Sequence, residues 1–223
     1  MKKVEVLKRY VLFIIGLFFA GIGVAFTKHG ELGVSPISSV ANVMSCKFTF
    51  FSIGSWLILW NCVLIVGQIL ILRKDFKLYQ FLQIPLSFLF GFFTDFGMWL
   101  VSFIPVPNYF IKLLMLFIGI VVLALGIALS VIANVIMNSG EAIVKAISDK
   151  TGFEFGNVKV AFDISCVTLA LVLSLLFFDF QIVGIREGTI LSALCTGFVV
   201  KFFSRHLREG LEKVLKMAAI LQN

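Results

Sequence analysis

Charged residues are scarce in this sequence, and acidic residues are the scarcest of them. Only 14% of the 223 residues are charged, and 12 Asp and Glu stand against 19 Lys and Arg. Soluble globular domains carry about 25% charged residues, so this composition argues against a soluble fold. The basic residues lie beside apolar segments and are not interleaved with aromatic side chains, which argues against nucleic acid as a partner.

Metal-binding and catalytic patterns are also missing. The four cysteines are scattered without CxxC spacing, and the two histidines, His29 and His206, lie far apart in the chain. We therefore expect no disulfide framework, no metal site and no cofactor. Neither a nucleophile–base set nor a phosphate-binding loop is present, so we do not expect an enzyme.

Long apolar runs are what the sequence has instead. Hydrophobic residues make up 60% of the chain. They gather in six segments of roughly 20 residues, the length at which a helix crosses a bilayer while satisfying its own backbone hydrogen bonds. The sequence thus predicts an all-α polytopic membrane protein in contact with the lipid bilayer. The six segments are residues 10–27, 53–72, 78–104, 110–134, 158–178 and 183–203.

Basic residues predict how these segments are oriented. Cytoplasmic loops are rich in Lys and Arg, and only four of the 19 basic residues fall on the opposite side of the predicted membrane. Both termini, residues 1–9 and 204–223, are therefore expected in the cytoplasm. The tail has an apolar stripe opposite a charged face, which is typical of an amphipathic helix on an anionic membrane surface. The four exceptions are Lys28, Lys47, Lys112 and Arg186.

The two halves of the chain, residues 10–104 and 110–203, resemble one another at an offset of about 103 residues. Each half contains three predicted spans. Because three is an odd number, the two copies must face opposite ways, which is the inverted-repeat plan of many secondary transporters. The matches are Gly16–Ala25 with Gly119–Ala128, Phe51–Gly54 with Phe153–Gly156, Asn61 with Asp163, Gly91 with Gly197, and Asp95 with Lys201.

A short helix is predicted after the first span of each repeat. In the first repeat, Ser35 is a capping residue and Pro36 suits the first helical position. In the second, the helix begins with the cap-type residues Asn138 and Ser139 and ends before Gly152. If these helices enter the membrane, their first N–H groups form a site for an anionic group. Otherwise they lie flat at the interface and connect the spans.

Polar side chains within spans are costly and are therefore functional candidates. Asp163, in the fifth span, either binds a cation, a proton or a substrate amine, or pairs with Lys159 one turn earlier. Asn61 lies at a comparable depth in the second span, where it either contacts a ligand or forms an interhelical hydrogen bond. The binding candidates from the short helices are Ser35, Ser38, Ser39, Asn138 and Glu141.

Charged residues near the ends of spans are candidates for gates. Arg186 and Glu187 begin the sixth span, where they form either an external gate or a charged helix start. Asp95 lies near the outer end of the third span, where an interfacial role is the alternative to a gate.

Three motifs carry a resemblance to a known family. They are Leu32–Ser39 after the first span, Lys159–Asp163 in the fifth span, and Val183–Ile190 at the start of the last. With these motifs the chain resembles the bacterial YczE/YyaS/YitT family of membrane proteins over nearly its whole length. The resemblance implies a six-span protein of the bacterial plasma or inner membrane and supplies no catalytic residues.

Together these features predict a small secondary transporter or exporter of an unidentified small molecule or ion. The ligand would bind near Asn61 and Asp163, and access would alternate as one repeat moves against the other. The alternative is a non-transporting membrane component. This would be a substrate-capture subunit of a larger transporter, or a scaffold that regulates other membrane proteins. Both hypotheses allow a homo-oligomer or a partner protein in the membrane.

Overall fold

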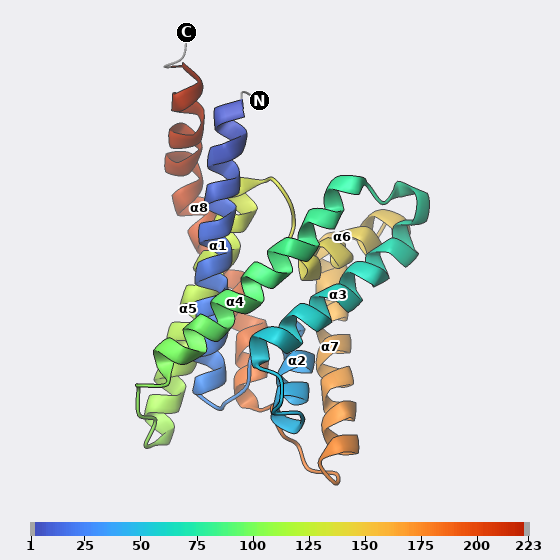
Figure 1. Ribbon diagram of the computed structural model, residues 1–223, viewed down its shortest axis with the longest axis vertical. Coiled ribbons are helices and arrows are strands. Elements are labelled where there is room, and N and C mark those ends of the chain that lie inside the picture. The colour runs from blue at the N-terminus through green and yellow to red at the C-terminus, as the bar shows by residue number, and fades with distance from the viewer. Residues whose placement is uncertain (1–2, 221–223) are drawn as a thin grey trace.

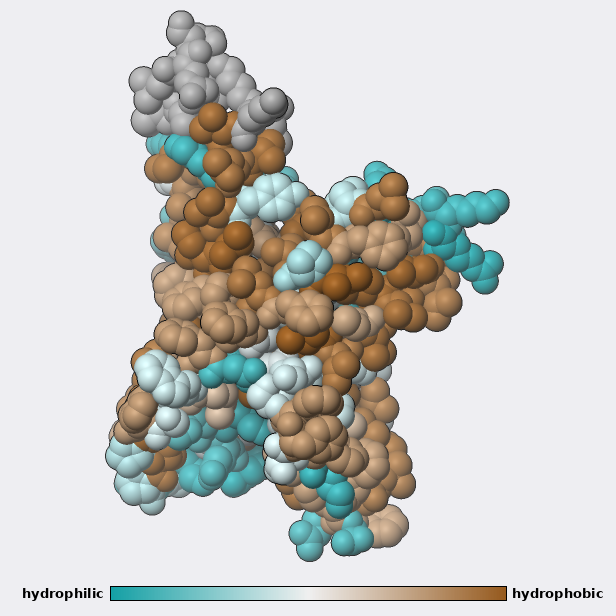
Figure 2. All heavy atoms as spheres, viewed as in Figure 1, coloured by the Kyte–Doolittle hydropathy of each residue, from teal (hydrophilic) through white to brown (hydrophobic). Residues whose placement is uncertain are grey.

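The computed structural model describes residues 3–220, which are mostly helical and contain no strand. Six of the helices are long and apolar enough to cross a membrane, so the prediction of an all-α polytopic membrane protein is confirmed. Figure 2 shows apolar side chains across the middle of one face, with hydrophilic ones gathered toward its ends. The long helices (Figure 1) are α1 (Lys3–His29), α3 (Ile53–Leu72), α4 (Gln83–Val101), α5 (Tyr109–Ala133), α7 (Phe155–Phe177) and α8 (Glu187–Ile220).

Two short helices, α2 (Pro36–Lys47) and α6 (Ser139–Thr151), follow α1 and α5. Each half of the chain therefore runs long, short, long, long. Two turns of 3-10 helix, Arg73–Asp75 and Leu78–Leu82, lie between α3 and α4. The predicted end of α6 is present, because Gly152 adopts a left-handed conformation with φ of 75° that a glycine reaches without strain.

The two short helices begin in different ways. Pro36 occupies the first position of α2 as predicted, but Ser35 does not cap the helix. Its Oγ instead donates a hydrogen bond to Ser38 Oγ at 2.9 Å. α6 is capped by a side chain, because Asn138 Oδ1 accepts a hydrogen bond from the backbone N–H of Ser139 at 3.1 Å.

α1 and α5 pack together at the centre of the molecule, where small residues let their backbones approach closely. A Cβ atom on Gly16 would lie 2.8 Å from the carbonyl oxygen of Gly126. One on Gly119 would lie 2.9 Å from the carbonyl oxygen of Gly23. Larger residues at these positions would force the two helices apart.

The helices form two groups, and each group takes elements from both halves of the chain. In the α1/α5 group (α1, α4, α5 and α8), α4 packs against α1 and α8 packs against α5. In the α3/α7 group (α2, α3, α6 and α7), both short helices pack against α3 and α7. The groups meet where α3 packs against α4. Between α7 and α8 there is no comparable packing within residues 3–220.

The described part of the C-terminal tail, 204–220, continues α8 without a break. The rest of the predicted amphipathic tail, 221–223, lies outside the described residues. Leu215 of this extension is buried in one apolar cluster with Leu12 of α1, and Leu207 and Leu211 pack against the same cluster, whereas Val214 is exposed. Figure 1 shows the start of α1 and the end of α8 at the same end of the molecule, which we call the terminal side.

Candidate binding site

A cavity of about 1110 Å³ lies between the α1/α5 group and the α3/α7 group. This is enough space for a small molecule, since such ligands occupy pockets of about 300–1,000 Å³. The α1/α5 group contributes mainly apolar lining, such as Leu17, Leu123 and Ile127. The polar lining includes Ser35, Ser38, Trp60, Asn61, Asn138, Glu141, Lys159 and Asp163, with Ser192 and Thr196 from α8.

The cavity opens toward the terminal side. Its lining there includes the exposed charged residues Asp75, Lys77, Lys150 and Arg208. Lys150 Nζ lies 3.8 Å from Asp75 Oδ2, and an exposed pair of this kind contributes little to stability. The mouth is therefore an exposed, charged rim rather than a fixed seal.

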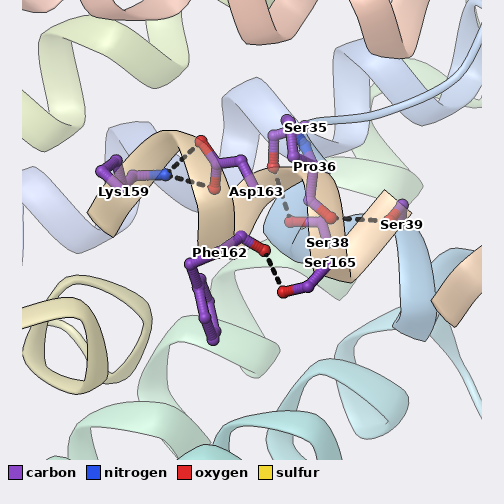
Figure 3. A network of polar contacts seen from close by, with 8 residues as sticks. All are labelled: Ser35, Pro36, Ser38, Ser39, Lys159, Phe162, Asp163 and Ser165. Atoms are coloured by element: carbon purple, nitrogen blue, oxygen red, sulfur yellow. Dashed lines mark hydrogen bonds and ion pairs between the residues drawn. The ribbon is translucent and has the colours of Figure 1, made fainter. Parts of the chain in front are cut away.

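Lys159 and Asp163 form an ion pair on α7. Lys159 Nζ donates to both carboxylate oxygens of Asp163 at 2.5 Å, and the two side chains are 28% and 20% exposed. Figure 3 shows this pair beside the start of α2, where Ser35 and Ser38 lie. The pairing that the sequence allowed is thus formed, and both residues also line the cavity. An ion pair and contact with a ligand are therefore compatible at this position.

Buried polar atoms without a hydrogen-bond partner gather on this cavity. Of the seven such side-chain atoms among the described residues, five belong to residues that line it. Two of those residues, Asn61 and Ser192, are only 4% and 0% exposed. Buried polar groups normally have partners, so these atoms mark a surface suited to a polar ligand. The five atoms are Trp60 Nε1, Asn61 Nδ2, Glu141 Oε2, Ser192 Oγ and Thr196 Oγ1.

Glu141 is the acidic residue in this set. It lies in the first turn of α6, outside the membrane-spanning helices. Burial raises the pKa of its carboxyl group above the ordinary value, although the nearby charge of Lys159 opposes the rise. The protonated form persists to higher pH as a result, and it can donate a hydrogen bond as well as accept one.

The starts of the two short helices meet at the cavity. Gly140 of α6 packs against the side chain of Ile37 of α2, and both residues line the cavity. The first N–H groups of a helix lack partners within it and carry partial positive charge. The positive ends of two helix dipoles therefore lie at one place.

A buried amide pair holds the start of α6 beside the cavity. Gln68 of α3 and Gln83 of α4 exchange two hydrogen bonds of 3.0 Å. Gln68 Nε2 also donates to the carbonyl oxygen of Ser139 at 3.3 Å. The hydroxyl of Ser87 lies 3.4 Å from that of Ser139. The first half of the chain thus anchors the short helix of the second half.

Lys28 and Asn42 anchor α2. Lys28 Nζ donates to Asn42 Oδ1 at 2.6 Å and to Ser45 Oγ at 3.0 Å. Asn42 Nδ2 donates to the carbonyl oxygen of Gly184 at 2.6 Å, just before α8. The positive charge of Lys28 is therefore used within the structure, where it ties α1 to α2.

Comparison with known proteins places the chain in a family. A model of a family of unknown function (DUF6198) matches residues 7–205. The chain belongs to the DUF6198 family. It is also 25% identical over 202 residues to the uncharacterized membrane protein YczE of Bacillus subtilis (strain 168). The aligned residues cover 90% of this chain and 87% of that protein. These findings confirm the resemblance drawn from the sequence motifs. No solved structure matches the DUF6198 chain.

The structure brings most of the sequence-predicted binding residues together. Ser39 is the exception, because its fully buried hydroxyl donates to the carbonyl oxygen of Pro36 at 2.6 Å and does not line the cavity. Contact with a ligand stays a prediction for the others. Those on the cavity wall are Asp163, Asn61, Lys159, Glu141, Ser35, Ser38 and Asn138.

The three gate candidates, Arg186, Glu187 and Asp95, lie outside the cavity lining. Asp95 Oδ1 accepts from the backbone N–H of Gly54 at 2.9 Å, and its Oδ2 accepts from Ser52 Oγ at 2.6 Å. Asp95 of α4 thus caps the start of α3. Arg186 donates to the carboxylate of Glu187 at 3.0 Å beside the start of α8, where both are exposed.

Sequence reasoning missed three residues on the cavity wall that have an unpartnered polar atom, namely Trp60, Ser192 and Thr196. Ser192 and Thr196 are four residues apart on α8 and therefore lie on one face, which is a signal that the sequence contains. Trp60 has no such signal, since a lone aromatic residue in a span is ordinary. No group of three or more Asp, Glu, His and Cys residues is arranged to hold a metal ion among residues 3–220.

Proposed function

We propose that this protein is a small secondary transporter or exporter that binds a polar small molecule or ion in its central cavity. The observation that carries the proposal is the set of five unpartnered polar atoms on the cavity wall. A buried polar group without a partner costs about 1–3 kcal/mol. A ligand that supplies partners for several of these atoms removes that cost and so gains affinity.

The lining offers donors and acceptors at separate points. Asn61 Nδ2, Trp60 Nε1 and the two helix starts are donors, and they suit a carboxylate or another oxygen-rich group. Glu141 and Asp163 are acceptors when ionised, and they suit an amine or a cation. The cavity therefore favours a small polar molecule that carries both kinds of group.

The inverted repeat is part of the proposal, and the α1–α5 contact supports it. The sequence pairs Gly16 with Gly119 and Gly23 with Gly126. When each glycine is replaced by its match in the other half, the contact of Gly16 with Gly126 becomes the contact of Gly119 with Gly23. The two Cβ-to-oxygen distances, 2.8 and 2.9 Å, agree closely. A two-fold axis between α1 and α5 would produce such a pair.

Alternating access would come from motion of the α3/α7 group against the α1/α5 group. The cavity lies between these groups and has its mouth on the terminal side. Sequence reasoning placed the motion between the two repeats, whereas the packing favours groups that each combine elements of both. With the termini in the cytoplasm, the mouth faces the cytoplasm. Reporter fusions at Lys47 and Lys150 test this orientation, because the proposal requires them on opposite sides.

Binding can be tested on the purified protein by a thermal-shift screen against metabolites and ions. For a compound that stabilises the protein, Asn61→Leu and Thr196→Val should each lower the affinity about two- to tenfold. Thr189→Val is the matched control, because the Thr189 hydroxyl is also buried and unpartnered but does not line the cavity. An equal loss of affinity in the control would contradict the proposed site.

Transport of the same compound can be tested in proteoliposomes that contain the purified chain alone. Loss of flux in Asp163→Asn supports a role for Asp163, and unchanged flux removes that role. Binding without flux favours the alternative hypothesis of a substrate-capture subunit. A regulator that acts through its basic tail should lose its activity when the exposed residues Arg205 and Lys213 are both changed to Gln, whereas a transporter should largely tolerate these two changes.

A further inference from the structure

Two matched glycine pairs differ between the halves of the chain. Gly54 and Gly91 bring α3 and α4 together, since a Cβ on Gly91 would lie 2.7 Å from the carbonyl oxygen of Gly54. The matched residues are Gly156 of α7 and Gly197 of α8. An added Cβ at either position would meet no neighbour within 4 Å. α7 and α8 thus carry the small residues of a close contact without forming one.

The polar residues beside these glycines also differ. In the first half, the hydrogen bond from Ser52 Oγ to Asp95 Oδ2 joins the start of α3 to α4. The sequence match places Glu154 at the position of Ser52 and Lys201 at that of Asp95. Both side chains are exposed, and neither forms an ion pair with any other residue in the range 3–220. Matched positions that hold a hydrogen bond in one half therefore hold opposite charges in the other.

We propose that α7 and α8 close on each other as α3 and α4 do, with Gly156 against Gly197 and an ion pair between Glu154 and Lys201. The inference rests on the proposed transport function and deepens it by naming the gate on the terminal side. Phe155 and Gly197 both line the cavity, so closure at this level covers its mouth.

The position of the formed contact explains why closure would alternate. α3 begins away from the terminal side, whereas α7 begins nearer to it (Figure 1). The α3–α4 contact therefore closes the far end of the boundary between the two helix groups, while the near end is open. Motion of one group against the other that closes α7 on α8 separates α3 from α4. Each of the two states then has one end closed.

Cross-linking tests this closure without knowledge of the cargo. In a variant whose four native cysteines are replaced by serine, Glu154→Cys and Lys201→Cys are combined and treated with a short thiol cross-linker in membranes. Ser52→Cys with Asp95→Cys is the positive control, because these side chains are in contact here. Glu154→Cys with Glu209→Cys is the negative control, because Glu209 lies two turns beyond Lys201 on α8.

We expect the 154/201 pair to cross-link and the 154/209 pair to remain free. Prior locking of the 52/95 pair by its own cross-link should abolish the 154/201 product, since the two contacts belong to different states. The proposal is overturned if the 52/95 pair cross-links and the 154/201 pair does not. It is equally overturned if the 154/201 product persists after the 52/95 pair is locked.

Charge exchange tests the ion pair itself, with Phe155→Cys and Val200→Cys as neighbouring reporters of closure. Glu154→Lys and Lys201→Glu should each slow their cross-linking about two- to fivefold, the range for a partly exposed ion pair. The double exchange should restore the rate, and Glu209→Lys should leave it unchanged. A double variant as slow as the single ones would remove the ion pair. If these results hold but no compound is transported, the gate stands and the transport proposal fails.

Discussion

The α3–α4 and α7–α8 contacts occupy matched positions in the two halves of the chain, yet only the first is formed. At the α1–α5 contact, by contrast, the halves present the same glycines at nearly the same distances. This difference in helix packing lies at one boundary of the cavity. Under the proposed inverted repeat, the two halves share the α1–α5 contact while their outer helices stand in different positions, which is what the proposed alternation between two states requires.

The test with the largest expected effect on stability replaces the matched glycines at the starts of α3 and α7. Gly54→Leu should lower the free energy of unfolding by about 3 kcal/mol, because the new side chain collides with the Gly91 carbonyl oxygen and Asp95. Gly156→Leu should be nearly neutral, because its surroundings are open. Thermal unfolding in detergent measures both. Equal losses would mean that the two contacts are equally formed.

The second test compares the anchors of the two short helices. Gln68→Leu should cost about 2 kcal/mol, because it leaves the Gln83 amide buried without a partner and removes the hydrogen bond to the Ser139 carbonyl oxygen. Gln68→Leu with Gln83→Leu should cost less than the sum of the single changes, since no unpaired amide remains. Lys28→Met tests the anchor of α2, and there we expect about 1 kcal/mol. Additive costs for the two glutamines would contradict the amide pair.

The third test compares Asp95 with its match Lys201. Asp95→Ala should destabilise the protein by about 1–2 kcal/mol, because the N–H of Gly54 and the hydroxyl of Ser52 lose their acceptor. Lys201→Ala should change stability by less than about 0.5 kcal/mol, because the side chain is exposed. Thermal unfolding of both variants at one pH decides the matter, and a large cost for Lys201→Ala would mean that α7 and α8 are already closed.

The smallest expected effect is the pH dependence of two glutamates with opposite shifts. Burial raises the pKa of Glu141, so the folded state binds the extra proton and loses stability as the pH rises from 4.5 through the folded pKa. The hydrogen bond and charge of Lys112 lower the pKa of Glu31, so its contribution to stability is present above 4.5 and is lost as the pH falls through the folded pKa. Toward neutral pH, Glu141→Gln should therefore gain stability relative to the parent and Glu31→Gln should lose it. Unfolding temperatures measured across pH would reveal the two signs, and the same sign for both would contradict the burial of Glu141.

Local patterns predicted much of the fold. Pro36 marked the start of α2 and Gly152 the end of α6, because both residues act on the backbone of their own turn. The tail shows the limit of such patterns, because an apolar stripe on a helix packs equally well against lipid or protein. Only the tertiary packing decides that Leu215 belongs to the same buried cluster as Leu12. Ser35 illustrates the same limit on a smaller scale, since its hydroxyl bonds to Ser38 instead of a backbone N–H.

By itself, the sequence determined the class of the protein, its six spans, its two short helices and the polar residues that a membrane tolerates only at a cost. These follow from hydropathy, helix capping and spacing, which depend on residues within one or two turns. The tertiary structure alone decided that Asn61 and Ser192 line one cavity and that Ser39 does not. It also decided that Asp95 caps α3 while Lys201 has no ion-pair partner within residues 3–220. The physical reason is that such contacts join residues distant in the chain, and they exist only once the helices have packed.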